Sequence, residues 1–389
     1  MPEETASIVY DTRLSEEQEA IRQLARDFAE NEIRPIVMEF DESQEFPTEI
    51  FRKMADLGFL GITVDAGMGG SGLGFLEYAL IVEEIARVDP SIALGVAAHN
   101  GLCTGHINRF SSDELRAKYV PRLASGETMG AWGLTEPGSG SDAGGMQTVG
   151  RRDGEDWIIS GSKNFITHGS VGNIAVIMAV TDREKGAHGI TAFVLDKSMP
   201  GFYATKKENK LGMRCSDTSS LVMEDVRVPG SNMIGEEGQG FKQALQILDG
   251  GRISIAALSV GLAQGALDAS LKYSTERRQF GKSLSEFQGI QFKLAWMATE
   301  IEAARHMTYL AAYLRDQGKP YATEASKAKF LASEVSVRCA TEAIQIHGGY
   351  GYIKEYPVEK FYRDAKLLTI GEGTSEIQKI VISRALVSG

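Results

Sequence analysis

One apolar stripe constrains the fold of this chain more than any other feature of its sequence. Between Phe287 and Leu314, apolar residues recur at every third or fourth position, at Ile290, Leu294, Met297, Ile301, Ala304, Met307 and Leu310. This spacing puts them on one face of a helix of about seven turns. Because a helix this long can bury such a stripe only against other long helices, the last third of the chain is predicted to form a helical bundle.

A glycine-rich region with a β pattern precedes this bundle. Sixteen glycines lie between Met129 and Gly230. They separate short runs of β-forming residues, at Trp157–Ile159, Ala175–Val180, Ile190–Leu195 and Leu221–Val228. Short strands divided by turn residues are typical of a compact antiparallel barrel or sandwich.

The first third of the chain has a helical pattern, from Ser15 to about Glu127. Ser15 can cap a helix, and Gln18 can complete a capping box. A further helix is expected from Phe75 to Val88. We therefore predict an α+β multidomain fold: an N-terminal α-helical domain (1–127), a middle β domain (128–235) and a C-terminal helical bundle (236–389).

Composition and charge disfavour several classes of protein. The net charge of −11 and the pI near 5.2 argue against nucleic-acid binding. The cysteines, Cys103, Cys215 and Cys339, are too sparse for a disulfide scaffold and indicate a reducing compartment. Ile253–Leu267 is shorter than the ~20 apolar residues of a membrane span, and Met1–Arg13 lacks the pattern of a secretory signal. We expect no membrane segment, and no metal-ligand spacing appears.

A glycine motif near the N-terminus imitates a dinucleotide-binding loop. Gly67–Gly72 reads G-x-G-x-x-G, follows an apolar run and precedes a helix. A dinucleotide fold needs alternating strands and helices behind that loop, whereas the sequence to residue 127 is helical throughout. An interhelical turn is therefore the favoured interpretation, and a phosphate loop the alternative.

Two polar clusters lie in the β region. Thr135–Asp142 combines hydroxyls with glycines, so a ligand could approach its backbone, or the segment could be a surface turn. Lys163–Gly169 could likewise bind a ligand or form a hairpin.

One carboxylate near the C-terminus stands out. Glu372 lies between Gly371 and Gly373, just before a helix expected from Glu376 to about Val387. A carboxylate there could cap the helix. The flanking glycines also allow a substrate to come close, which would make Glu372 a base whose pKa is tuned by burial.

Other charged and polar motifs have structural alternatives. Arg277–Lys282 carries three cations that could bind a pyrophosphate or form a solvated loop. Gln345–Gly349 is a glycine break in a helix, where His347 is expected to serve packing. The pairs Glu83-Glu84 and Glu236-Glu237 are expected on solvated faces.

Taken in order, these segments resemble the acyl-CoA dehydrogenase family over essentially the whole chain. The matching motifs are Leu134–Asp142, Phe165–Thr167, Arg277–Gly281 with Gln288, Gln345–Gly349 with Gly351-Tyr352, Tyr362–Asp364 and Gly371–Gln378. The resemblance implies an N-terminal helical domain, a middle β domain and a C-terminal four-helix bundle, and it is greatest to short-chain (butyryl-like) or short-branched-chain enzymes.

The same resemblance implies FAD as the cofactor and assigns residues to it. The cofactor-binding set is Trp132, Leu134, Thr135, Ser141, Phe165, Ile166, Thr167, Arg277, Phe280, Gln288, Gln345, Ile346, Gly348, Gly349, Thr374 and Glu376. Thr135 and Thr167 would hydrogen-bond the flavin ring, while Arg277 and Gln288 would hold the diphosphate and adenine half, possibly of a neighbouring subunit's FAD. The substrate-binding set is Ser141, Asp249, Arg252 and Gly373.

Glu372 occupies the position where most family members carry the general base. Some members place that base just before the arginine that is Arg252 here, and this chain has Gly251 there. Phe165 and Gly371 depart from the more usual Trp and Tyr. Ser91–Leu102 lacks the arginine that glutaryl-CoA dehydrogenases use, which disfavours a dicarboxylyl substrate.

The resemblance implies dehydrogenation of a saturated acyl-CoA to the trans-2-enoyl-CoA. Glu372 would take the Cα proton and flavin N5 the Cβ hydride, with an electron-transferring flavoprotein as acceptor. A homotetramer or homodimer is expected, in the cytoplasm or another reducing compartment such as the mitochondrial matrix with the transit peptide absent. The alternatives are a flavin monooxygenase or nitroalkane oxidase, a non-catalytic CoA-binding relative and, on the Gly67 loop alone, a nicotinamide oxidoreductase.

Overall fold

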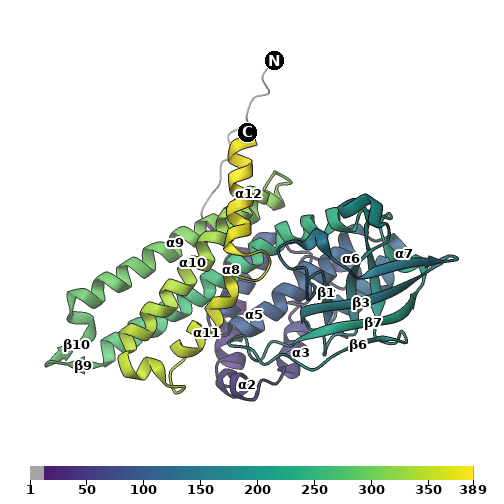
Figure 1. Ribbon diagram of the computed structural model, residues 1–389. Helices are drawn as coiled ribbons and strands as arrows, with labels where there is room; N and C mark the ends of the chain where they lie inside the picture. Colours follow the sequence, from purple (N-terminus) through teal and green to yellow (C-terminus); the bar gives the residue numbers. More distant parts are fainter. Residues whose placement is uncertain (1–12, 389) are drawn as a thin grey trace.

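A computed structural model describes residues 13–388 and shows a helical part, a β part and a second helical part in chain order (Figure 1). The predicted fold class is confirmed. The long helices of the last part extend away from the β sheet, and the N-terminal helices lie partly between the two and partly alongside the sheet (Figure 1). The segment Met1–Arg13, expected not to be a secretory signal, lies outside the described residues except for Arg13.

The N-terminal helices are short, and two of them are π-helices. Their bounds are α1 (Glu16–Phe28), the π-helix η1 (Ala29–Ile33), α2 (Val37–Ser43), α3 (Thr48–Asp56), the 3₁₀ turn η2 (Ala66–Met68), α4 (Phe75–Ala86), α5 (Pro90–Ala97), the π-helix η3 (Ala98–Thr104), α6 (Gly105–Phe110) and α7 (Asp113–Ala124). The capping box of Ser15 and Gln18 is present. Gly67–Gly72 begins inside η2 and leads into α4 with no strand before it, so it is the predicted interhelical turn.

The middle part is a curved sheet. Its strands are β1 (Gly130–Gly133), β2 (Val149–Asp153), β3 (Asp156–Thr167), β4 (Ile174–Val180), β5 (Ile190–Asp196), β6 (Phe202–Ala204), β7 (Thr218–Val228) and β8 (Met233–Ile234), in the spatial order β6-β7-β3-β2-β4-β5-β8. Most neighbours are antiparallel, as predicted. Two pairings depart from this, because β1 and β2 each run parallel to β4.

The C-terminal part is built on three long helices. The elements are α8 (Gly240–Glu276), the hairpin β9 (Arg278–Gln279) and β10 (Lys282–Ser283), α9 (Gln288–Asp316), α10 (Ala322–His347), the 3₁₀ turn η8 (Gly348–Tyr352), α11 (Val358–Leu368) and α12 (Ser375–Ser388). The apolar stripe that predicts a helix from Phe287 falls on α9. The helix α8 is long and apolar enough to span a membrane, but 83% of its most apolar window is buried inside the protein, as in a core helix.

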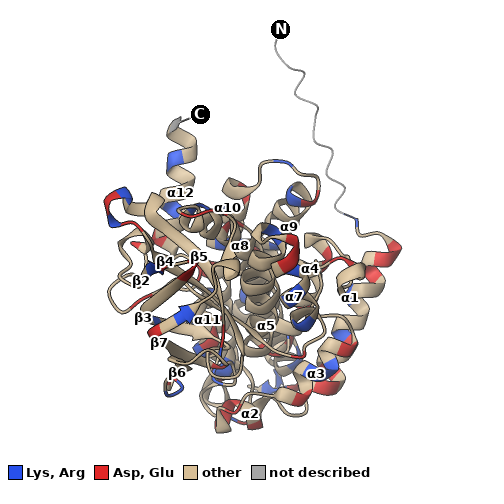
Figure 2. Cartoon of the chain, turned by 90° about the vertical axis from the view of Figure 1, so that its right-hand side faces the viewer, with Lys and Arg blue, Asp and Glu red and all other residues tan. Residues whose placement is uncertain are grey.

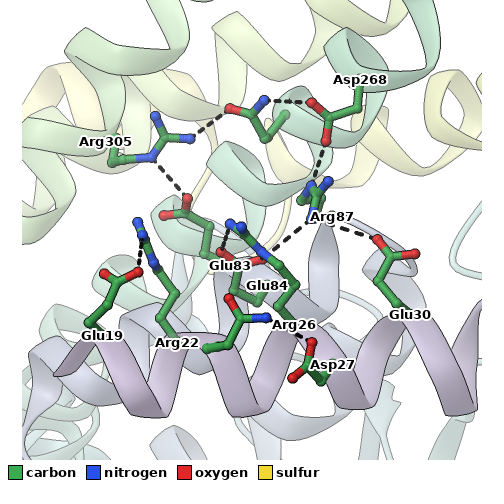
Figure 3. Close-up of polar contacts among 12 residues, drawn as sticks. Glu19, Arg22, Arg26, Asp27, Glu30, Glu83, Glu84, Arg87, Asp268 and Arg305 are labelled. Atoms are coloured by element: carbon green, nitrogen blue, oxygen red, sulfur yellow. Dashed lines mark hydrogen bonds and ion pairs between the residues drawn. The ribbon is translucent and has the colours of Figure 1, made fainter. Parts of the chain in front are cut away.

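A helix of the N-terminal part packs against the bundle. The helix α4 packs against α1, α8 and α9, so both of its long faces are covered. Consequently Glu83 and Glu84 are buried at 5% and 3% exposure, and the prediction that they lie on a solvated face is wrong. Each carboxylate has partners: Glu83 accepts a hydrogen bond from Arg305, and Glu84 accepts from Arg26 (Figure 3). Glu83 also accepts a hydrogen bond from the Tyr309 hydroxyl.

Charge separates the outer helices from the inner ones. Figure 2 shows Lys, Arg, Asp and Glu along α1 and α3 on the outside, whereas α5 in the centre has none. The helices α5 and α8 contact each other directly. This contact forms the apolar centre against which the candidate site is built.

The Tyr362–Asp364 motif ties the three parts together. Asp364, on α11, accepts a hydrogen bond from the backbone N–H of Met213 (2.5 Å), and Lys360 lies between the carboxylates of Asp364 (2.6 Å) and Asp89 (2.9 Å). Arg363 forms an ion pair with Asp41 of α2. These contacts give the motif a structural role and fix α11, and therefore the turn that follows it.

Candidate active site

The turn between α11 and α12 carries Glu372 in a strained conformation. Glu372 has φ of +52° and Gly373 has φ of +92°. A non-glycine residue in the left-handed region is uncommon and occurs often at functional sites. Two buried side chains hold the turn, because Lys329 Nζ donates to the Gly373 carbonyl (2.7 Å) and Gln378 Nε2 donates to the same oxygen (2.9 Å).

The carboxylate of Glu372 points at a glycine of α8. A Cβ built on Gly251 would overlap Oε2 of Glu372, and its next nearest neighbours would be Glu372 Cδ at 3.0 Å and Leu102 Cδ2 at 3.5 Å. The glycine at position 251 therefore has a second consequence besides the absence of the alternative base. It leaves the space that the carboxylate of Glu372 occupies.

Burial controls the charge of this carboxylate. Glu372 as a residue is half-buried, but its Oε2 atom is buried and has no hydrogen-bond partner among the described residues. Burial raises the pKa of Glu372 to about 7, although the positive charges of Lys329 and Arg252 act in the opposite direction. A carboxylate with a pKa near neutrality can accept a proton and release it again at physiological pH.

Two cations, Lys329 and Arg252, lie beside Glu372. Burial lowers the pKa of Lys329 to about 8, partly offset by the charge of Glu372. Arg252 is 6% exposed and donates to Asp249 (2.7 Å) and to Ser326 (3.2 Å). The predicted substrate residues Asp249 and Arg252 thus lie on the same part of α8 as Gly251.

Two elements of the N-terminal part close the far side of Glu372. The π-helix η3 contributes Leu102, and α4 contributes Tyr78, which is fully buried. Tyr78 donates to the Ala97 carbonyl (2.7 Å), and burial raises its pKa, with the charge of Glu372 acting in the same direction. The sequence alone did not point to Lys329, Tyr78 or Leu102, because each sits in a helix with no local motif.

The two polar clusters of the β domain are brought together. The backbone N–H of Asn164 donates to the Thr135 carbonyl (2.8 Å). Beside them, the buried Lys163 forms an ion pair with Glu136 (2.7 Å). Glu136 also accepts hydrogen bonds from the backbone N–H groups of Gln147 and Thr148. Lys163 belongs to β3 and not to a hairpin turn, so Glu136 serves to clamp the glycine-rich loop against that strand.

The β1 strand joins this cluster to the carboxylate through η3. The indole N–H of Trp132 donates to His106 Nδ1 (3.0 Å), and the backbone N–H of Gly130 donates to His99 Nδ1 (3.1 Å). His99 lies on η3, three residues from Leu102, which is next to Gly251. The predicted residues of the β domain and Glu372 therefore share one supporting helix.

The remaining predicted residues lie elsewhere in the chain. Arg277 follows the end of α8, about 39 Å from Gly251 at 1.5 Å per residue. The set at this distal end is Arg277, Phe280, Gln288, Gln345, Ile346, Gly348 and Gly349. Figure 1 shows β9 and β10 at the end of the bundle opposite the sheet. Within one chain, the predicted cofactor residues therefore form two groups at opposite ends of the bundle.

Both groups fit a large aromatic cofactor. Phe165, in the first group, is 67% exposed. Phe280, in the second group, and Tyr352 beside that group are 94% and 86% exposed. A Cβ would meet no atom within 4 Å at the glycines of these segments, which are Gly138, Gly140, Gly281, Gly348 and Gly349. Exposed rings next to open backbone suit an extended ligand with a ring system and phosphates. Leu134, Ile166 and Ile346 pack their side chains in hydrophobic cores, so a ligand could meet only their backbones.

Sequence comparison decides the family. Residues 15–127, 131–226 and 238–387 match, respectively, the profiles described as acyl-CoA dehydrogenase N-terminal domain, middle domain and C-terminal domain. The chain belongs to the acyl-CoA dehydrogenase family. It is therefore an oxidoreductase of the acyl-CoA dehydrogenase type, and the cofactor of this family is FAD.

Individual relatives cover nearly the whole chain. A short-chain specific acyl-CoA dehydrogenase of Clostridium acetobutylicum is 48% identical over 96% of this chain and 98% of its own length. The CarC subunit of the caffeyl-CoA reductase-Etf complex of Acetobacterium woodii is 46% identical over 96% and 99%. The structure of butyryl-CoA dehydrogenase from Megasphaera elsdenii superimposes with a TM-score of 0.95 at 44% identity, over 97% and 100% of the two chains.

Proposed function

We propose that this acyl-CoA dehydrogenase oxidises short saturated acyl-CoA thioesters to trans-2-enoyl-CoA, with Glu372 as the catalytic base. The observation that carries the proposal is the buried Oε2 atom of Glu372, which has a raised pKa and no hydrogen-bond partner among the described residues. A buried charge without a partner is costly in a protein. Its retention is explained if a substrate C–H group is what it faces.

The residues around Glu372 divide the work of proton abstraction. Glu372 takes the Cα proton, and its backbone N–H polarises the thioester carbonyl; a donor of this kind is worth ~2.7 to 4 kcal/mol in the transition state. Lys329 holds the left-handed turn through Gly373, so the carboxylate stays aimed at the substrate. The chemistry that FAD would supply when bound is the acceptance of a hydride from Cβ.

The cofactor set is proposed as two half-sites. Trp132, Thr135, Phe165 and Thr167 would meet the flavin near Glu372, with Thr374 and Glu376 at the start of α12. The distal group around Arg277 would serve a neighbouring subunit, because it lies about 39 Å along α8 from Gly251. This arrangement requires at least a homodimer, and a homotetramer is the expected assembly.

The relatives guide the choice of substrate and acceptor. The short-chain name of the Clostridium relative favours butyryl-CoA-sized substrates, and the Etf complex of the CarC relative favours an electron-transferring flavoprotein as partner. CarC is named a reductase, so reduction of a 2-enoyl-CoA is the second candidate. We place the enzyme in the cytoplasm or a similar reducing compartment.

An anaerobic titration tests the proposal. The purified holoenzyme is mixed with butyryl-, hexanoyl- and octanoyl-CoA while the flavin absorbance is recorded. Bleaching with formation of enoyl-CoA supports the proposal. Binding without bleaching would favour a non-catalytic relative, and consumption of crotonyl-CoA only, with reduced flavin, would favour the reductase.

A further inference from the structure

We infer that Tyr78 of α4 forms the end wall of the acyl-binding region and sets the length of the acyl chain that this enzyme accepts. The inference rests on the proposed function, because it assumes that the acyl group lies beside Glu372. It assigns chain-length specificity to one side chain that has no part in the chemistry.

The Tyr78 hydroxyl lies beside α8, one turn of α8 beyond the residue that Glu372 contacts. Gly251 and Ser254 of α8 are three residues apart and therefore share a face, separated by about 4.5 Å along the helix. Glu372 Oε2 lies against Gly251, and the hydroxyl of Ser254 donates to the Gly251 carbonyl (2.9 Å). A Cβ built on Gly101 would meet both the Tyr78 hydroxyl (3.0 Å) and the Ser254 hydroxyl (3.9 Å), so Tyr78 closes the same face of α8 at the next turn.

On the side opposite α8, two neighbouring residues of η3 face Glu372 and Tyr78 in the same order. Leu102 of η3 is near the Gly251 position, and its neighbour Gly101 faces Tyr78, whose hydroxyl would lie 3.0 Å from a Cβ at Gly101. The Tyr78 hydroxyl also donates to the Ala97 carbonyl of α5. Tyr78 therefore bridges the two elements, α8 and the α5–η3 segment, that flank Glu372.

The difference in burial along α8 fixes the direction in which the substrate lies. Asp249, on the N-terminal side of Gly251, is half-buried, whereas every residue from Gly250 to Ala263 is buried. The CoA end must reach solvent and therefore leaves on the Asp249 side. The acyl end then points along α8 toward Ser254 and meets Tyr78.

Tyr78 is held in place from behind. Its ring makes an edge contact with Phe75 (5.5 Å between centroids), and the Arg315 guanidinium stacks on Phe75 at 3.3 Å. Tyr78 is fully buried, so it cannot swing into solvent to admit a longer chain. A rigid wall rejects extra methylene groups by steric overlap.

The test compares acyl-chain preference in matched variants. Tyr78→Leu and Tyr78→Ala shorten the wall, Tyr78→Phe keeps its size, and Tyr119→Leu serves as control because Tyr119 is another buried tyrosine (2% exposed), on α7. For each FAD-loaded variant, kcat/KM is measured with butyryl-, hexanoyl- and octanoyl-CoA. Binding of the non-oxidisable thioethers S-butyl-CoA and S-octyl-CoA is measured by calorimetry.

We expect the octanoyl-to-butyryl ratio of kcat/KM to rise at least ~10-fold in Tyr78→Leu, since each buried methylene is worth about fourfold. It should stay within about twofold in Tyr78→Phe and Tyr119→Leu. An unchanged ratio in folded Tyr78→Leu, or a wild-type preference for octanoyl-CoA, overturns the inference. If the wild type oxidises no acyl-CoA, the proposed function fails, and the S-octyl-to-S-butyl affinity ratio still decides the role of Tyr78. If Tyr78→Ala does not fold, Tyr78→Leu decides.

Discussion

Two glutamates with buried carboxylate oxygens, Glu83 and Glu372, have opposite environments. Glu83 of α4 faces α9, where one of its oxygens accepts from Arg305 (2.9 Å; Figure 3). Its other oxygen accepts from the Tyr309 hydroxyl (2.8 Å). Glu372 has an oxygen with no partner among the residues described, and burial raises its pKa to about 7. Both are carboxylates at helical interfaces, yet only one has its charge fully satisfied.

The difference separates a structural charge from a reactive one. A buried carboxylate whose oxygens both accept hydrogen bonds holds helices together. When a buried carboxylate oxygen has no hydrogen-bond donor, the ionised form is less stable, so the group can act as a base near neutral pH. Partner count, more than burial, therefore indicates which glutamate does chemistry.

The largest expected effect comes from removing the base. Glu372→Gln keeps the shape of the side chain but cannot accept a proton, so we expect kcat with butyryl-CoA to fall by ~10² to 10⁴. FAD content, measured by absorbance after denaturation, should not change. Near-normal turnover in this variant would remove Glu372 from the role of base.

Removing a partner from Glu83 should destabilise the fold without touching the chemistry. In Arg305→Met, the carboxylate of Glu83 loses its cation in a buried position, which costs ~3 to 5 kcal/mol of the free energy of unfolding. The control is Arg52→Gln, which breaks an exposed ion pair with Glu49 and should change stability by about 0.5 kcal/mol or less. Urea unfolding measures both. If Arg305→Met lost activity per flavin and kept its stability, the distinction between the two glutamates would fail.

The pH dependence of stability should expose the unsatisfied charge of Glu372. Its folded pKa is raised above the value of the unfolded chain, so between about pH 4.5 and 7 the folded state binds more protons and stability falls as pH rises. Glu372→Gln lacks this penalty. We expect its stability advantage over the wild type to grow by about 2 kcal/mol from pH 5.5 to pH 8.5. Thermal unfolding at both pH values measures it, and an advantage independent of pH contradicts a raised pKa.

The smallest effect concerns the space around the carboxylate. Gly251→Ala puts a methyl group where Oε2 of Glu372 lies, so the base must shift, and kcat should fall roughly 10- to 100-fold. Gly67→Ala is the control, because a Cβ there meets no atom within 4 Å. Equal activity in the two variants would show that the position of the carboxylate is not constrained by Gly251.

Much of the fold could be predicted because its signals are local. The spacing of apolar residues along α9 predicts a long helix, and the Ser15 capping box marks the start of α1. Glu372 could be singled out for the same reason, since its two flanking glycines are adjacent in the sequence. The parallel pairing of β1 with β4 could not be predicted, because no feature of a four-residue strand specifies the direction of its neighbour.

By itself the sequence determined the order of helical and β regions and the one carboxylate set between glycines. Tertiary structure alone decided which charges are satisfied and what surrounds the base. The face of α4 that carries Glu83 would be solvated in an isolated helix, but α8 and α9 cover it. Lys329 reaches Gly373 from 44 residues away. Desolvation and hydrogen bonding depend on atoms that meet only after folding, so the pKa of Glu372 and the wall formed by Tyr78 belong to the folded chain.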